Sequence, residues 1–98
     1  MGMLVDFAIF PLDKGESVST YVARVVKIIR ETGLAHTLGP MGTCIEGEWH
    51  EVMALVTRCF EELSKESDRI YFTIKADYRR DAAGRIRNKV KSIESKLA

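Results

Sequence analysis

The apolar residues of this chain repeat every two positions in some segments and every three to four in others, and this order restricts the fold most. Positions 3–12 alternate between apolar and polar or small side chains, which is typical of a strand with one buried face. Pro11 ends this strand, because proline cannot continue a hydrogen-bonded ladder inside a sheet. Positions 70–77 alternate in the same way and predict a second half-buried strand.

Three segments have helical spacing instead. The first covers 18–31 and follows Ser17, whose hydroxyl we expect to cap the first turn. Gly33 occupies the position at which a left-handed residue commonly ends a helix. The second helix begins at Trp49, and the third carries its apolar stripe from Ile86 onward. The predicted stripe of the second helix consists of Trp49, Val52, Met53, Val56, Cys59, Phe60 and Leu63.

Two short segments between the first two helices, "LAHTLGP" and "GTCIEGE", are typical of paired strands. The turn between them spans Gly39 to Gly42, and we expect its glycines to adopt positive φ. The segment lacks the GxxxxGK[ST] pattern and joins two strands, so it does not indicate a phosphate loop.

The predicted order is β-α-β-β-α-β with an extra C-terminal helix. Two crossover units that share one four-stranded antiparallel sheet form a ferredoxin-like α+β plait, here a single domain over 1–98. The first two helices cover one face of the sheet. The other face is mixed in polarity, so it must be solvated, bind a ligand or pack on another subunit. Its expected members are Asp6, Ala8, Tyr71, Thr73 and Lys75.

Charge and hydropathy argue against two classes of partner. The formal net charge is +1, so the chain as a whole does not attract nucleic acid or acidic membrane. The basic segment 78–91 is typical of the solvated face of an amphipathic helix. No run of about 18 apolar residues is present. Two cysteines do not make a secreted disulfide framework, so we expect a cytoplasmic protein.

The possible metal ligands, Cys44, Cys59, His36 and His50, lack the spacing of a zinc site. Cys59 falls on an apolar helical stripe, where a thiol behaves as a small hydrophobic group. A small enzyme that uses Cys44 as nucleophile would need a positioned base, and the spacing identifies none. We therefore expect no catalytic residues, no metal and no cofactor.

Glu46 has two interpretations of equal weight. It lies next to Gly47 on a short strand, where its carboxylate could accept hydrogen bonds from a planar nitrogen heterocycle, with Thr43 nearby. Alternatively, it could stabilise the N-terminus of the following helix electrostatically. Spacing does not decide between the two.

Nearly the whole chain resembles the family of small thiamine-binding proteins. The resemblance rests on "PMGTCIEGEW", on "KADYRRDAAGRIRNKVKSIE" and on the opening "DFAIFPLDKGESVSTYVARVVKIIRETGL" with its Ser-Val-Ser segment. It implies a ferredoxin-like fold, assembly into dimers or tetramers, and binding of thiamine or its hydroxymethylpyrimidine half without catalysis.

The resemblance also implies a site. The family motif places Thr43 and Glu46 at or beside the ligand, and Ser17 and Ser19 are further candidates. His36, Thr37 and Met41 are added because they are neighbours of these residues. The alternative is a structural or regulatory oligomer that binds a protein partner through its sheet face. We also expect Asp77 to form an inter-subunit ion pair with Arg79 or Arg80. The alternative is that these are surface charges that contribute little to stability.

Overall fold

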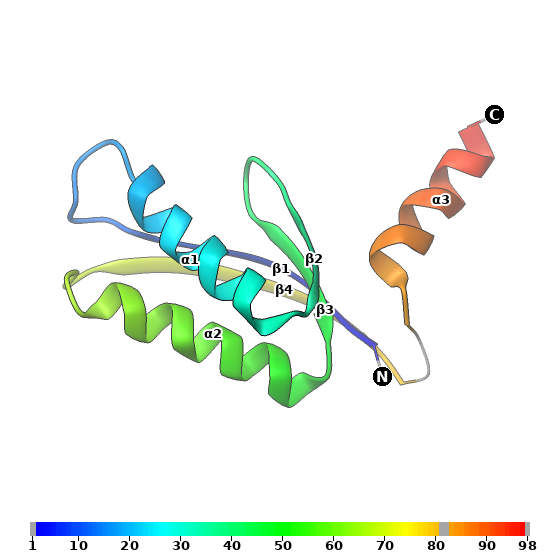
Figure 1. Cartoon of the computed structure of the whole chain (residues 1–98). Coiled ribbons are helices and arrows are strands. Elements are labelled where there is room, and N and C mark those ends of the chain that lie inside the picture. The colour runs from blue at the N-terminus through cyan, green and yellow to red at the C-terminus, as the bar shows by residue number, and fades with distance from the viewer. Residues whose placement is uncertain (1, 81–82, 98) are drawn as a thin grey trace.

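The computed structural model describes residues 2–80 and 83–97, and these form the expected order of elements (Figure 1). The elements are β1 (Gly2–Pro11), α1 (Ser19–Thr32), β2 (Ala35–Leu38), β3 (Thr43–Gly47), α2 (Trp49–Ser64), β4 (Ile70–Arg79) and α3 (Arg85–Leu97). The four strands make one antiparallel sheet in the order β2-β3-β1-β4. The predicted ferredoxin-like α+β class is therefore confirmed.

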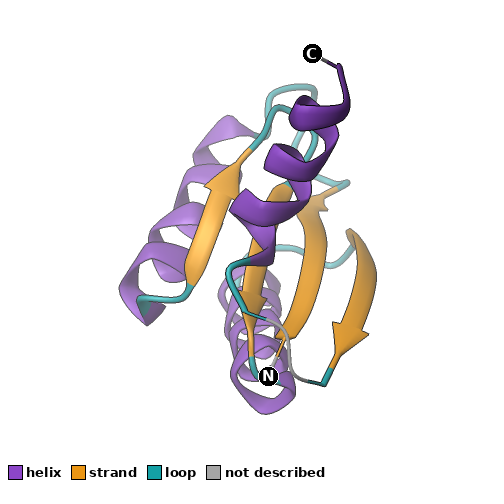
Figure 2. Cartoon of the chain, turned by 90° about the vertical axis from the view of Figure 1, so that its right-hand side faces the viewer, coloured by secondary structure: helices purple, strands orange, loops and turns teal. Residues whose placement is uncertain are grey.

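The core lies between one face of this sheet and the helices α1 and α2. Met3, Val5, Phe7 and Ile9 alternate along β1 and are all buried, as the two-residue period predicts. From the helices and β3 the core gains Val25, Ile28, Ile29, Ile45, Val52, Leu55, Val56, Cys59 and Leu63. Figure 2, turned by 90°, shows the strands side by side with α3 apart from the two other helices.

Helix α1 ends as expected but does not begin as expected. Gly33 has φ 74° and its amide bonds to the carbonyl of Arg30, so the left-handed C-terminal position is confirmed. The predicted cap by Ser17 is wrong. Val18 occupies the N-cap, and no side-chain hydrogen bond closes the first turn.

The apolar stripe of α2 is only partly the predicted one. Trp49 is 62% exposed and Phe60 44% exposed, whereas Leu55, which we did not assign to the stripe, is buried. A stripe of seven residues is wider than the face that the sheet and α1 cover, so its margins remain in solvent.

Strand β4 is not half-buried. Its alternation is real, because Ile74 pairs with buried Phe7 and Lys75 with exposed Asp6 on the neighbouring strand. Every residue of β4 after Ile70 is nonetheless exposed, because β4 is an edge strand that α1 and α2 hardly cover.

The hairpin between β2 and β3 uses its glycines for close approach rather than for positive φ. Neither Gly39 nor Gly42 has positive φ, which corrects the expectation from the sequence. A Cβ at Gly42 would lie 3.0 Å from the carbonyl oxygen of Phe7 and 3.2 Å from the carboxylate of Asp6. Glycine is needed here because β1 passes directly beside the turn.

Candidate ligand pocket between the sheet and the C-terminal helix

Glu46 lies on the sheet face that α1 and α2 leave open. It pairs with Leu4 in the β1–β3 register, one position from the buried pair of Val5 and Ile45, so its side chain leaves the sheet on the side opposite the core. The residue is nevertheless only 9% exposed. Helix α3 covers it, because α3 contacts β1, β2 and β3 at this end of the sheet.

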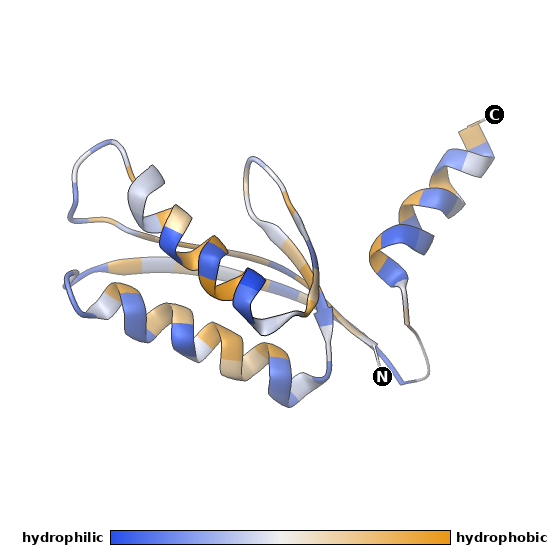
Figure 3. Cartoon of the chain, in the orientation of Figure 1, coloured by the Kyte–Doolittle hydropathy of each residue, from blue (hydrophilic) through white to orange (hydrophobic). Residues whose placement is uncertain are grey.

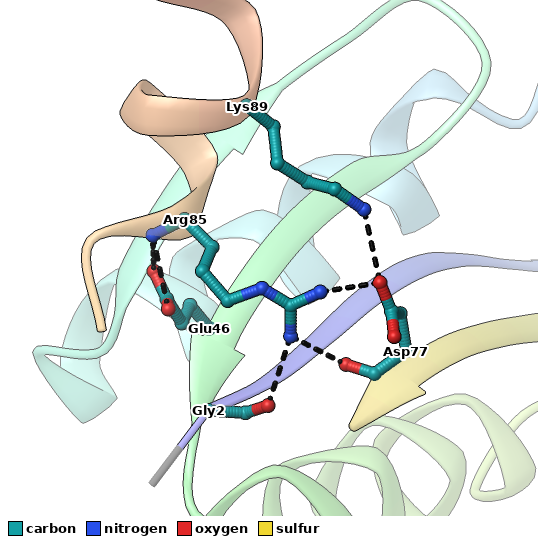
Figure 4. Close-up of polar contacts among 5 residues, drawn as sticks. All are labelled: Gly2, Glu46, Asp77, Arg85 and Lys89. Carbon is teal, nitrogen blue, oxygen red and sulfur yellow. Dashed lines mark hydrogen bonds and ion pairs between the residues drawn. The ribbon is translucent and has the colours of Figure 1, made fainter. Parts of the chain in front are cut away.

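The carboxylate of Glu46 receives the first amide of α3. The backbone nitrogen of Arg85 lies 2.9 Å from one carboxylate oxygen and 3.1 Å from the other (Figure 4). A carboxylate at this position accepts a hydrogen bond from an amide that no helical carbonyl can reach. Its negative charge is also attracted to the positive end of the helix dipole. Glu46 therefore does stabilise a helix N-terminus, but the helix is α3.

The adjacent helix α2 has a separate cap. The side chain of Glu48 accepts a backbone hydrogen bond of the first turn, while the amide of Glu48 donates to the carboxylate of Glu51 at 3.0 Å. This reciprocal capping box leaves Glu46 no part in starting α2, which corrects the second interpretation of Glu46.

Arg85 is buried beside Glu46, with 7% of its side chain exposed. One guanidinium nitrogen donates to the carbonyls of Gly2 at 3.0 Å and Asp77 at 2.9 Å, and the other donates to the carboxylate of Asp77. Lys89 reaches the same carboxylate at 2.9 Å, as Figure 4 shows. The pKa of Asp77 is lowered, first by the hydrogen bond from Lys89 and then by the nearby charge of Arg85.

These contacts correct one expectation. Arg85 belongs to the basic segment that we interpreted as a solvated face, yet it is buried and bonded to three strands. Asp77 pairs with Arg85 and Lys89 of its own chain, and an ion pair between subunits at this position stays a prediction. No sequence signal separates Arg85 from the neighbouring arginines, because only the fold brings Gly2 and Asp77 to the start of α3.

A cavity of about 600 Å³ opens between β2, β3 and the first turns of α3. Its walls combine aliphatic groups with both signs of charge. The lining residues are Ala35, His36, Thr37, Glu46, Gly84, Ile86, Arg87, Val90, Lys91 and Glu94. The volume falls within the range of small-molecule sites, which commonly measure about 300 to 1,000 Å³.

Three of the seven predicted site residues, His36, Thr37 and Glu46, line this cavity. Thr43 and Met41 line a second cavity of about 190 Å³ between β1, α1 and the hairpin. Thr43 is 5% exposed and pairs with core residue Phe7, so it lies on the opposite face of the sheet from Glu46.

Ser17 and Ser19 are exposed, and neither lines the two cavities just described. They lie around the start of α1, which Figure 1 shows at the opposite end of the molecule from α3. One chain therefore does not bring Ser17 and Ser19 to a ligand beside Glu46.

Neither cysteine lines the cavity beside Glu46. Cys44 is partly buried on the open sheet face, and Cys59 is fully buried in the core, where burial raises the pKa of its thiol to about 11. Within the described residues, no group of three or more His, Cys, Asp or Glu side chains is placed to hold a metal ion.

Known relatives of the chain match it over nearly its whole length. Residues 5–94 match the family model described as thiamine-binding protein. The chain belongs to the thiamine-binding protein family.

A UPF0045 protein of Synechocystis is 40% identical over 98 residues, which cover 99% of this chain and 81% of the relative. The UPF0045 protein ECM15 of Eremothecium gossypii is 39% identical, over 97% of this chain and 92% of the relative.

Solved structures share the fold. A hypothetical protein of Methanocaldococcus jannaschii superposes with a TM-score of 0.87 at 29% identity, over 95% of this chain and 96% of that one. A Thermotoga maritima protein provisionally assigned to thiamine biosynthesis or salvage has a TM-score of 0.83 at 22% identity, over 95% and 99% of the two chains. At that identity the second likeness concerns the fold alone. Within the described residues, no helix is both long and apolar enough to cross a membrane.

Proposed function

We propose that this chain binds thiamine or its hydroxymethylpyrimidine moiety, without catalysis, in the cavity between the sheet and α3. The observation that carries the proposal is the nearly buried carboxylate of Glu46 in the wall of a cavity of about 600 Å³, in a member of the thiamine-binding protein family. An aminopyrimidine presents N–H donors at its edge, and a carboxylate is the acceptor that binds such donors most strongly.

The two carboxylate oxygens of Glu46 retain room for a ligand. The Arg85 amide is one donor shared between both oxygens, whereas a carboxylate has about four lone-pair sites. The hydroxyl of Thr37 adds a second polar group, and the side chains of Ile86 and Val90 offer apolar surface to a ring. Glu94 on the same wall, beside the cations Arg87 and Lys91, offers a negative charge to a thiazolium ring.

Replacement of Glu46 by glutamine tests this site. The amide oxygen of glutamine still accepts the Arg85 hydrogen bond, so α3 keeps its cap, but the charge that assists the ligand's hydrogen bonds is lost. We expect the Kd for thiamine or hydroxymethylpyrimidine, measured by isothermal titration calorimetry, to rise about tenfold, the equivalent of about 1.4 kcal/mol. Glu61→Gln on the exposed side of α2 removes the same charge and should leave Kd unchanged. An unchanged Kd in Glu46→Gln would exclude Glu46 from the site.

We also propose that the chain acts as a homo-oligomer, a dimer or tetramer, in the cytoplasm. Strand β4 has ten residues and, among the described strands, pairs only with β1. Phe72, Ile74 and Tyr78 are exposed along it. An unpaired edge with apolar side chains is suited to pairing with the same strand of a second copy. The free thiols of Cys44 and Cys59 fit a reducing compartment.

The open sheet face favours a second candidate, a structural or regulatory oligomer with a protein partner. Tyr71 is half exposed on this face and lies against Phe10, with ring centroids 5.5 Å apart. If titration of the native chain with millimolar thiamine and hydroxymethylpyrimidine gives neither heat nor a thermal shift, this second candidate replaces the first.

A further inference from the structure

Helix α3 is docked in a different way from α1 and α2. Arg85 is its one buried residue, whereas α2 buries five and α1 three. The apolar residues Val90, Ile93 and Leu97 are 54%, 62% and 80% exposed. Figure 3 shows hydrophobic and hydrophilic stretches interleaved along α3. Burial of an apolar face, which holds most surface helices, contributes little here.

Polar contacts hold α3 instead, most of them made by Arg85 and one by Lys89, which bonds to Asp77. The amide of Arg85 bonds to Glu46 on β3. Its guanidinium bonds to Gly2 on β1 and to both the carbonyl and the carboxylate of Asp77 on β4. One residue thus connects the start of α3 to three strands. A planar guanidinium with several fixed donors suits this arrangement, and lysine could not reproduce it.

Helix α3 is also half of the cavity wall. Ile86, Arg87, Val90, Lys91 and Glu94 of α3 face the strand residues across the cavity. If α3 leaves the sheet, these groups leave with it, and the carboxylate of Glu46 is exposed to water. The cavity therefore exists only while α3 is docked.

We propose that Arg85 is a positioning residue of the ligand site, and that ligand binding and the docking of α3 stabilise each other. The inference deepens the proposed function and rests on it, since it concerns the same pocket. Coupling of two equilibria is reciprocal: the factor by which docking of α3 strengthens ligand binding is the factor by which bound ligand strengthens docking. Loss of Arg85 weakens ligand binding to the extent that it lowers the fraction of molecules with α3 docked. If only a tenth of molecules keep α3 docked, the apparent Kd rises about tenfold.

Calorimetric titration with thiamine and with hydroxymethylpyrimidine tests whether the docking of α3 by Arg85 strengthens ligand binding. We expect Arg85→Gln to raise Kd at least about tenfold, while Arg85→Lys, which keeps the charge, restores part of the affinity. Arg58→Gln is the matched control, because Arg58 lies exposed on α2 at 3.6 Å from Glu31, on the other face of the sheet. It should leave Kd unchanged.

Hydrogen exchange on the native chain tests whether bound ligand strengthens the docking of α3. This measurement needs no variant, so it does not depend on whether a variant folds. A free helix of 13 residues is only marginally stable in water, so exchange at the α3 amides reports docking. We expect saturating thiamine or hydroxymethylpyrimidine to slow exchange throughout α3, including residues 95–97 beyond the cavity lining.

The outcomes separate this inference from the proposed function. If the native chain binds neither compound, the proposed function is wrong and the inference falls with it. If the native chain binds and Arg85→Gln binds equally well, or if ligand leaves α3 exchange unchanged, the inference alone is wrong. Weaker binding in Arg85→Gln together with slower exchange in α3 supports it.

Discussion

Glu46 and Arg85 have structural roles in addition to the roles that we propose for them in the ligand site. Each is a charged group that would be costly to bury alone. Glu46 is satisfied by the first amide of α3, and Arg85 by two carbonyls and a carboxylate. Within the described residues, no buried side-chain nitrogen or oxygen lacks a hydrogen-bond partner. A ligand at Glu46 must therefore use the spare lone pairs of a carboxylate that already has a structural role.

The two cysteines differ in burial, so we expect their thiols to differ in reactivity. Cys59 is fully buried and its thiol has a pKa of about 11, so almost no thiolate is present near neutral pH. We expect iodoacetamide to alkylate partly exposed Cys44 in the native chain and Cys59 only after denaturation, as peptide mass spectrometry would show. A Cys44→Ser variant should take up no label while folded. Native labelling of Cys59 at the rate of Cys44 would contradict the burial of its thiol.

At the scale of elements, two loops at the end of the sheet opposite α3 are joined by one side chain. Asp13, after β1, accepts hydrogen bonds from the hydroxyl of Ser67 and from the amide of Asp68 at 2.7 Å, between α2 and β4. These bonds favour the charged form, and the pKa of Asp13 is lowered from its ordinary value of 3.8, mainly by Ser67. The link fixes where β4 begins relative to β1.

A pH dependence of stability follows from the Asp13 link. A carboxyl whose pKa is lower in the folded chain stabilises that chain above the unfolded pKa, and the effect disappears as pH falls through the folded pKa. We expect the urea midpoint to fall as pH decreases from about 5 to 2, and to fall less steeply in Asp13→Asn. Asp68→Asn removes a similar charge nearby but keeps the backbone amide, so its pH profile should match the native one. Identical profiles for Asp13→Asn and the native chain would refute this role.

At the scale of the whole molecule, the sheet is unevenly covered. Helices α1 and α2 bury the face that β1 and β3 present to them, but they leave β4 exposed on both sides and unpaired along one edge. The open face and the exposed stripe of α3 add further apolar surface. Together these surfaces support the proposed self-association, because a monomer would leave them in contact with water.

Substitution in β4 tests the proposed self-association. Ile74 is 36% exposed, and a lysine there would place a charge in a β4–β4 contact while remaining compatible with an exposed edge. We expect Ile74→Lys to shift the sedimentation profile toward the monomer at concentrations where the native chain is a dimer or tetramer. Phe60→Lys removes an apolar group of similar exposure from α2 and should leave the assembly intact. A native chain that sediments as a monomer would overturn the proposal outright.

The sequence alone determined the order of the elements, the face of each strand and the family. Alternation along 3–12 and 70–77 has a period that only strands produce, and Gly33 marks a helix end because its left-handed conformation is unfavourable for other residues. The extent of the domain and the list of ligand-binding residues stay predictions.

Tertiary structure decided burial and the partners of charged groups. Periodicity shows which side chains share a face, but not which faces another element covers. Trp49 and every residue of β4 after Ile70 are therefore exposed despite their regular spacing. Thr43 and Glu46, three residues apart, were expected at one ligand, yet the odd spacing puts them on opposite faces of the sheet. The contact between Glu46 and Arg85 joins residues 39 positions apart. Local spacing contains no information at that range, because such contacts exist only once the strands have assembled.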